Sequence, residues 1–131
     1  MLKAFASLLF IITCAAAAMA QDPVTVDSNH YKVEFENEHV RVLRVKVGPG
    51  EKSIMHQHPN AVAVFMTDIN GKFTFPDGKT EATARKAGEV LWTPAVNHLP
   101  ENVGKEAFEV ILVELKGGPP SGRTPTPTNK N

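Results

Sequence analysis

Residues 61–93 read AVAVFMTDINGKFTFPDGKTEATARKAGEVLWT, and this stretch indicates how the chain folds. Short runs of β-branched and aromatic residues alternate with Gly, Pro, Asn and Asp, which are the residues that form turns. Asn70-Gly71 and Asp77-Gly78 have the sequence of two-residue hairpin turns, because these residue types tolerate positive φ. The stretch therefore predicts an antiparallel meander of three strands at 61–69, 72–75 and 80–86.

The same pattern extends in both directions from this stretch. No window has a 3.6-residue period long enough to predict a helix. Val110–Val113 is apolar at both parities, which is typical of a strand that is covered on both faces or lies centrally in a sheet. The chain after residue 20 predicts an all-β fold, a sandwich or a barrel. Its eight expected strands are 31–35, 40–47, 53–58, 61–67, 72–75, 80–86, 89–93 and 108–115.

The first twenty residues, MLKAFASLLFIITCAAAAMA, have the layout of a bacterial secretory signal peptide. Lys3 precedes an apolar run, and Ala18-Met19-Ala20 supplies the small residues of a cleavage site. We expect cleavage after Ala20 and a periplasmic or secreted protein. A retained membrane anchor is disfavoured because alanines fill the end of the apolar run. A lipoprotein attached through Cys14 is disfavoured because Thr13 stands where a small residue is required.

The remainder of the chain has no cysteine and nearly balanced charge. The full sequence has 14 Lys and Arg against 14 Asp and Glu, five His, and one Cys that lies in the leader. A neutral chain lacks the basic excess that nucleic-acid binding needs, and we expect no membrane association after the leader is removed. Residues 117–131, rich in Gly, Pro and Thr, predict a disordered tail. We therefore expect one domain at 21–116, stabilised by its core or by a metal.

Histidines are the strongest metal ligands left in this domain. In a strand, His56 and His58 lie on the same side about 6–7 Å apart, because side chains alternate. His98 follows a later strand, and it would join the pair if the two strands were neighbours. The alternative is that these residues are ordinary structural or exposed histidines. His30 and His39 stand near strand starts among charged residues, and no site role is assigned to them.

Two stretches resemble the two sequence motifs of the cupin family. Gly50 precedes His56-Gln57-His58 by five intervening residues, as in the first motif. The run Gly88-Glu89-Val90-Leu91-Trp92-Thr93-Pro94, followed by His98 and Asn102, is similar to the second motif. The two stretches occur in the order that the family shows, and the resemblance covers about residues 29–116.

The resemblance implies a small single-domain jelly-roll β-barrel of the RmlC-like type with one divalent metal ion inside it, iron, manganese, nickel or zinc. It implies that His56, His58 and His98 are the metal ligands. The family's glutamate comes four or five residues after the second histidine, and here Val62 and Ala63 occupy those positions. The first motif is therefore degenerate. Asp68, the next acidic residue, lies too far along the chain to take its place.

The missing carboxylate shapes the functional expectation. Three neutral imidazoles leave a divalent ion its full charge, so we expect a small organic ligand, anionic or chelating, at the open positions. The resemblance implies dioxygenase-like or isomerase-like chemistry at such a site. The alternative is a metal-free, non-catalytic cupin that binds a small molecule or serves as a structural dimer. Small cupins often pair through sheet edges, so the resemblance implies a homodimer as one assembly open to this chain.

Further residues are candidates for the wall of the site. Large apolar side chains on the predicted strands either line a ligand pocket or are ordinary core. Two polar residues just beyond His98 could hydrogen-bond the metal-ligating histidines from outside, or they could be loop surface. The pocket candidates are Phe65, Met66, Phe73, Phe75 and Trp92, and the polar candidates are Glu101 and Asn102.

Overall fold

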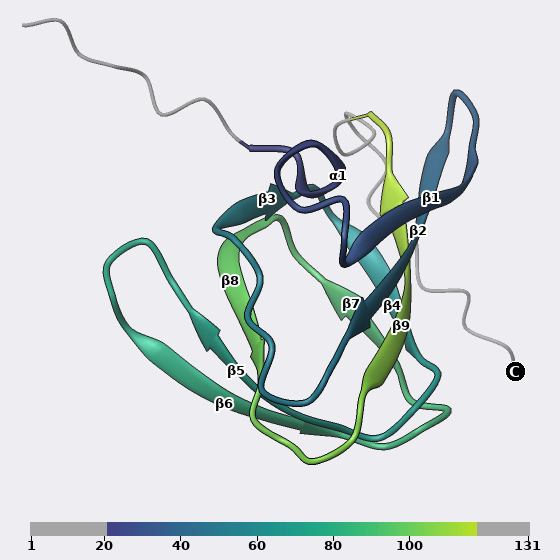
Figure 1. Ribbon diagram of the computed structural model, residues 1–131. Coiled ribbons are helices and arrows are strands. Elements are labelled where there is room, and N and C mark those ends of the chain that lie inside the picture. Colours follow the sequence, from purple (N-terminus) through teal and green to yellow (C-terminus); the bar gives the residue numbers. More distant parts are fainter. Residues whose placement is uncertain (1–20, 118–131) are drawn as a thin grey trace, which may run out of the picture.

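The computed structural model describes residues 21–117 as two antiparallel β-sheets that close into a flattened barrel (Figure 1). The predicted leader and residues 118–131 of the predicted tail lie outside the described residues. The all-β expectation is confirmed, with a jelly-roll barrel as its form. Between residues 21 and 117, no helix is long and apolar enough to span a membrane.

One short helix and nine strands make up the described chain. In chain order they are α1 (Pro23–Val26), β1 (Tyr31–Glu36), β2 (Val40–Val47), β3 (His56–His58), β4 (Ala61–Phe65), β5 (Ile69–Thr74), β6 (Thr80–Arg85), β7 (Val90–Thr93), β8 (Val96–Asn102) and β9 (Phe108–Leu115).

The strands are divided between a five-stranded sheet, ordered β1-β2-β9-β4-β7, and a four-stranded sheet, ordered β3-β8-β5-β6. Strand β9 lies at the centre of the larger sheet, paired with β2 on one side and β4 on the other. Its Val110 and Leu112 point into the barrel and are buried. The central position predicted from its apolar sequence is therefore confirmed.

Alternation along the strands builds the core. Leu43, Val45 and Val47 of β2 are buried at every second position. On the same face of the sheet they lie beside Leu112, Val110 and Phe108 of β9, respectively. Ala61 and Ala63 of β4 add the third strand, where small side chains leave space inside the barrel. Removing this apolar surface from water is the main driving force for closing the two sheets.

Four local predictions are corrected by the structure. Asn70-Gly71 is not a turn: both residues lie inside β5, because β4 pairs with β7 and β9 and the chain crosses to the other sheet before residue 69. The Asp77-Gly78 turn is confirmed, with Gly78 at φ 83° between the paired strands β5 and β6.

The other corrections concern elements that the sequence pattern hides. Strand β8 was not predicted, since Asn97, Pro100 and Asn102 interrupt its apolar pattern, and it takes shape by pairing with β3 and β5. Strand β3 begins at His56 and not at residue 53. The helix α1 is a single turn that Asp22 caps by accepting hydrogen bonds from the N–H groups of Val24 and Thr25.

Candidate metal centre

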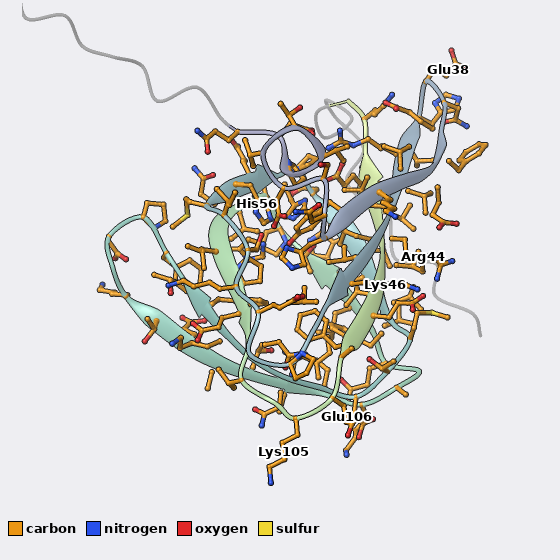
Figure 2. All side chains as sticks on the ribbon, viewed as in Figure 1. Glu38, Arg44, Lys46, His56, Lys105 and Glu106 are labelled. Atoms are coloured by element: carbon orange, nitrogen blue, oxygen red, sulfur yellow. The ribbon has the colours of Figure 1, made fainter. Side chains whose placement is uncertain are left out.

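Three histidines meet inside the barrel because β3 and β8 are neighbours. His56 and His58 are two residues apart on β3 and point the same way, and His98 of β8 is the register partner of His56. The ring centroid of His98 lies 5.1 Å from that of His56 and 5.4 Å from that of His58. Figure 2 shows His56 in the interior near α1. The expected convergence of the three histidines is thus confirmed.

The hydrogen bonds of His56 and His58 fix which nitrogen of each ring is free. Nδ1 of His56 lies 2.6 Å from the carbonyl oxygen of Ile54, and Nδ1 of His58 lies 2.6 Å from Oε1 of Glu114. Both acceptors require a proton on Nδ1, so each ring presents Nε2 to the other. The two Nε2 atoms are 2.9 Å apart. Two lone pairs at that distance repel unless a cation or a proton lies between them.

His98 completes the group with a nitrogen that has no partner. Its Nε2 is buried and forms no hydrogen bond within residues 21–117. Burial, with the neighbouring His58 and His56 adding to it, lowers the pKa of His98 to about 3. Burial and His58 likewise lower the pKa of His56 to about 4. At neutral pH both rings are therefore uncharged and able to donate a lone pair.

The donor set fits a divalent metal ion. The ligand nitrogens of the three histidines lie within 4.8 Å of one another. Nitrogen ligands on one ion, with bonds of about 2.0–2.1 Å, stand roughly 2.8–3.4 Å apart for bond angles between a right angle and a tetrahedral one. The 2.9 Å between the Nε2 atoms of His56 and His58 falls in this range. The cluster could hold a metal ion, and the free nitrogen of His98 supplies a third ligand.

Glu114 is the carboxylate of this site, and the sequence analysis missed it. Its side chain is 2% exposed, accepts the Nδ1 proton of His58, and accepts a hydrogen bond from Nε of Arg41 at 2.6 Å. Burial raises the pKa of Glu114, but the hydrogen bonds from His58 and Arg41 outweigh it and the pKa is lowered overall. An ionised carboxylate therefore fixes the tautomer of His58 from behind.

The sequence does contain a signal for the Arg41–Glu114 pair. In β9, Glu114 has the parity of Val110 and Leu112, and in β2, Arg41 has the parity of Leu43 and Val45. A charged residue at an inward position is unusual enough to be noticed. The register places Arg41 opposite Glu114, so that two inward charges on neighbouring strands meet.

The segment after residue 20 covers this end of the barrel (Figure 1). The carbonyl oxygen of Gln21 accepts a hydrogen bond from the N–H of Gln57, and Asp22 forms an ion pair with Arg41 at 2.6 Å. Asp27 is buried and accepts a hydrogen bond from Ser53 Oγ at 2.5 Å. Contacts on both sides of α1 thus hold the segment beside the histidines.

A cavity of about 300 Å³ adjoins the cluster inside the barrel. His58 and His98 form part of its wall, and most of the remainder is aliphatic or aromatic. Among the pocket candidates, Phe65, Phe73, Phe75 and Trp92 line it, and the Phe73 ring packs 4.7 Å from that of His98. Met66 is 49% exposed and does not line this cavity. Trp92 is mainly exposed and contributes to the cavity from an edge strand.

The two polar candidates beyond His98 have other partners. Glu101 lines the cavity and forms an ion pair with Lys72 at 2.9 Å. Asn102 is buried, donates to the carbonyl oxygens of Val47 and Glu106, and accepts from the N–H of Gly104. Neither side chain forms a hydrogen bond with the three histidines. Asn102 fixes the loop between β8 and β9.

The positions of the missing family glutamate hold no polar group. Ala63 faces inward and is buried, and Val62 belongs to the opposite face of β4. Asp68 lies at the surface, where it forms an ion pair with Lys86 at 2.6 Å. The expectation that Asp68 does not fill the vacancy is confirmed.

Comparison with known proteins identifies which solved structures share this fold. No protein-family model matches the sequence, and no curated protein matches it. Among solved structures, a cupin domain from Bordetella pertussis Tohama I superimposes with a TM-score of 0.62 and 26% identity, over 66% of this chain and 92% of that one.

Two further solved structures share the fold. An RmlC-like cupin family protein with a double-stranded β-helix fold, from Methanocaldococcus jannaschii, gives a TM-score of 0.53 at 21% identity, over 69% of this chain and 84% of that one. A cupin 2 conserved barrel domain protein from Salinispora arenicola CNS-205 gives 0.52 at 22% identity, over 70% and 79%. With its two-sheet jelly roll and these neighbours, the chain has the fold of RmlC-like cupins, the double-stranded β-helix.

Proposed function

We propose that this chain is an exported cupin that binds one divalent metal ion through His56, His58 and His98. One observation carries the proposal: the Nε2 atoms of His56 and His58 face each other at 2.9 Å, while both Nδ1 atoms are already bonded to acceptors. That arrangement calls for a cation between the rings, and the free Nε2 of His98 supports a metal ion over a proton. Iron, manganese, nickel and zinc all suit imidazole ligands.

The adjoining cavity supports a small organic molecule as the ligand. Its volume of about 300 Å³ is at the lower end of ligand pockets, which suits a molecule of one or two rings. Phe65, Phe73 and Leu91 favour an apolar body for this molecule. Three neutral imidazoles leave the ion its full charge, which favours an anionic or chelating group at the end that reaches the ion.

The ion would act there as a Lewis acid, or, if it is iron, as a centre for oxygen chemistry of the dioxygenase type. The chain's own residues have more limited roles. Glu114 keeps the Nδ1 proton on His58, so that Nε2 stays available as a ligand. The aromatic wall gives the cavity an apolar lining. Export to the periplasm or beyond is supported by the leader sequence.

Elemental analysis of the purified protein tests the metal. We expect one equivalent of metal in the wild type and none in the His56→Ala/His58→Ala variant. The matched control is His39→Ala, which removes a histidine whose side chain is 77% exposed and should leave the metal content unchanged. A wild-type protein that takes up no stoichiometric metal, even after incubation with iron, manganese, nickel and zinc in turn, would overturn the proposal.

Ligand binding separates this proposal from the metal-free alternative. Isothermal titration calorimetry measures the binding directly. We expect small aromatic acids to bind the metal-loaded protein and to bind the His56→Ala/His58→Ala variant much more weakly. Equal binding by the two proteins would favour the non-catalytic small-molecule binder. Oxygen uptake with thiols, catechols and flavonoid-like phenols then tests the dioxygenase version.

A further inference from the structure

Two edge strands wall one side of the cavity beside the histidines. Strand β6 is the edge of the four-stranded sheet, β7 is the edge of the five-stranded sheet, and a turn at residues 86–89 joins them (Figure 1). Because the two strands belong to different sheets, side chains close the barrel on this side. Thr83 and Arg85 of β6 and Leu91 and Thr93 of β7 line the cavity here.

Arg85 brings a full positive charge to the wall of this cavity. In β6 it has the parity of Thr83, and its register partner on β5 is the buried Ile69, so its side chain lies on the inner side of the sheet. Of the residues in 21–117 that line the cavity, Arg85 is the only lysine or arginine. The one lining carboxylate, Glu101, is paired with Lys72 at 2.9 Å.

The partners of Arg85 within the described chain are weak ones. Its Nε lies 4.0 Å from Oε2 of Glu89, and the two side chains are 39% and 42% exposed. Its Nη1 donates to the carbonyl oxygen of the adjacent Ala84 at 3.0 Å. An exposed ion pair at such a distance contributes little, and a guanidinium has five N–H donors. Arg85 therefore keeps donors for a further acceptor.

Arg85 and the histidines lie at opposite ends of the cavity. Extending the β5–β8 register by one residue puts His98 beside Phe75, whereas Arg85 stands beside Ile69, six residues earlier in β5. At about 3.3 Å per residue, the two backbone levels are at most about 20 Å apart. Both side chains line the cavity, so a ligand has less than this distance to bridge.

The wall between these two ends is apolar. Phe65, Phe73 and Leu91 line it, and an apolar molecule can therefore lie along the cavity without leaving polar groups unpaired. At the far end, the planar fork of a guanidinium matches a carboxylate with two parallel hydrogen bonds. Partial removal from water strengthens such a pair. A cationic group at each end and an apolar wall between them select a molecule that is polar at both ends.

We propose that Arg85 binds a carboxylate at the end of the ligand that lies away from the histidines. The ligand class is then an acid of one or two rings, with a metal-binding group at one end and a carboxylate at the other. This inference rests on the proposed function, because it takes the cavity as the ligand site and the metal ion as the partner of the near end. Arg85 is a specificity-determining residue and has no part in holding the metal.

Isothermal titration calorimetry with matched pairs of acids tests this assignment. The probes are benzoate against terephthalate, and biphenyl-4-carboxylate against biphenyl-4,4′-dicarboxylate, so each pair differs by one distal carboxylate. We expect the metal-loaded wild type to bind at least one diacid about tenfold or more tightly than its monoacid. Arg85→Gln should remove this preference and leave the affinity for the monoacid unchanged. Arg85→Lys keeps the charge without the fork and should retain part of the preference.

The matched control is Lys86→Gln. It removes the neighbouring cation, which pairs with Asp68 at 2.6 Å and does not line the cavity. This variant should keep the wild-type preference for the diacid. Circular dichroism establishes that each variant is folded, and equal metal content in all of them shows that the metal site is untouched.

Four results contradict the assignment of Arg85. They are equal binding of monoacid and diacid by the wild type in both pairs, a preference that persists in Arg85→Gln, an equal loss of preference in Lys86→Gln, and no binding of any probe at millimolar concentration. A failure of the proposed metal site is seen separately, as a wild type without metal by elemental analysis. The diacid preference and its loss in Arg85→Gln are then measured on the metal-free protein and decide the assignment there.

Discussion

His30 and the cluster of His56, His58 and His98 lie at the same end of the barrel, yet their surroundings have opposite effects. His30 contacts two carboxylates, Asp27 at 2.8 Å and Glu51 at 3.1 Å. Burial lowers the pKa of His30, but hydrogen bonds to Asp27 and Glu51 outweigh it and the pKa is raised overall. Among the residues that the structure describes, His98 has no carboxylate partner, and burial lowers its pKa to about 3.

The difference shows what a site for an external cation requires. The environment of His30 favours a proton on the ring, so the protonated ring itself supplies the positive charge between the two carboxylates. In the cluster, the carboxylate of Glu114 bonds Nδ1 of His58 on the outer side of the ring. The Nε2 atoms of His56 and His58, on the inner side, keep their lone pairs. Placing the acid behind the ring leaves room for an ion in front of it.

The largest expected effect comes from removing Glu114, the carboxylate behind His58. Glu114→Ala leaves the partly buried Arg41 with Asp22 as its remaining ion-pair partner, and leaves the buried Nδ1 proton of His58 without an acceptor. We expect a loss of about 1–3 kcal/mol in the free energy of unfolding and a fall of roughly 10–100-fold in metal affinity. Urea unfolding and metal titration measure the two effects.

The control for this variant is Glu101→Gln, which neutralises the partly buried acid of the Lys72–Glu101 pair, a residue with no hydrogen bond to the three histidines. It should change neither the unfolding midpoint nor the metal affinity. If Glu114→Ala unfolds before metal can be titrated, Glu114→Gln retains the shape and an acceptor oxygen and should show the metal effect alone. Unchanged metal affinity in Glu114→Gln and Glu114→Ala would contradict the role given to Glu114.

The second prediction concerns acid and the metal-free protein. The pKa of His98 is about 3 in the folded state against 6.5 for the free side chain, so the unfolded chain binds one more proton between these values. Stability is therefore lost as pH falls below about 6.5. His98→Leu should reduce the slope of unfolding free energy against pH by up to about 1.4 kcal/mol per pH unit.

Urea unfolding at a series of acidic pH values, after removal of metal with a chelator, gives this slope. His39→Leu, at an exposed position between β1 and β2, is the control and should keep the wild-type slope. A His98→Leu variant with an unchanged slope would show that His98 is not buried as a neutral ring.

The smallest expected effect comes from His30, whose contribution to stability depends on pH in the direction opposite to that of His98. Its raised pKa stabilises the folded state fully below about pH 6.5, and this contribution is lost as pH rises through the folded-state pKa. The stability difference between wild type and His30→Gln should therefore be largest in mildly acidic buffer and shrink in alkaline buffer. Thermal unfolding followed by circular dichroism at several pH values measures it, and a difference that grows with pH would refute the assignment.

Much of the barrel could be predicted, because the spacing of apolar residues along each strand is visible in the sequence itself. The runs at 40–47 and 108–115 identify buried strands, and Asp77-Gly78 identifies a turn. Asn70-Gly71 was misassigned because its sequence suits a turn, whereas pairing with β6 and β8 holds it extended. Strand β8 was missed for the same reason: partners on both sides, and not its own residues, make it a strand.

The sequence by itself determined an all-β domain, a leader-like N-terminus and the three histidines as ligand candidates, because residue type and period-two spacing are local properties. Only the tertiary structure decided that β3 and β8 are neighbours, that Arg41 and Glu114 meet behind His58, and that Arg85 lines the cavity. Each of these depends on which strands pair and in what register. Strand pairing joins residues far apart in the chain, so no local window contains it.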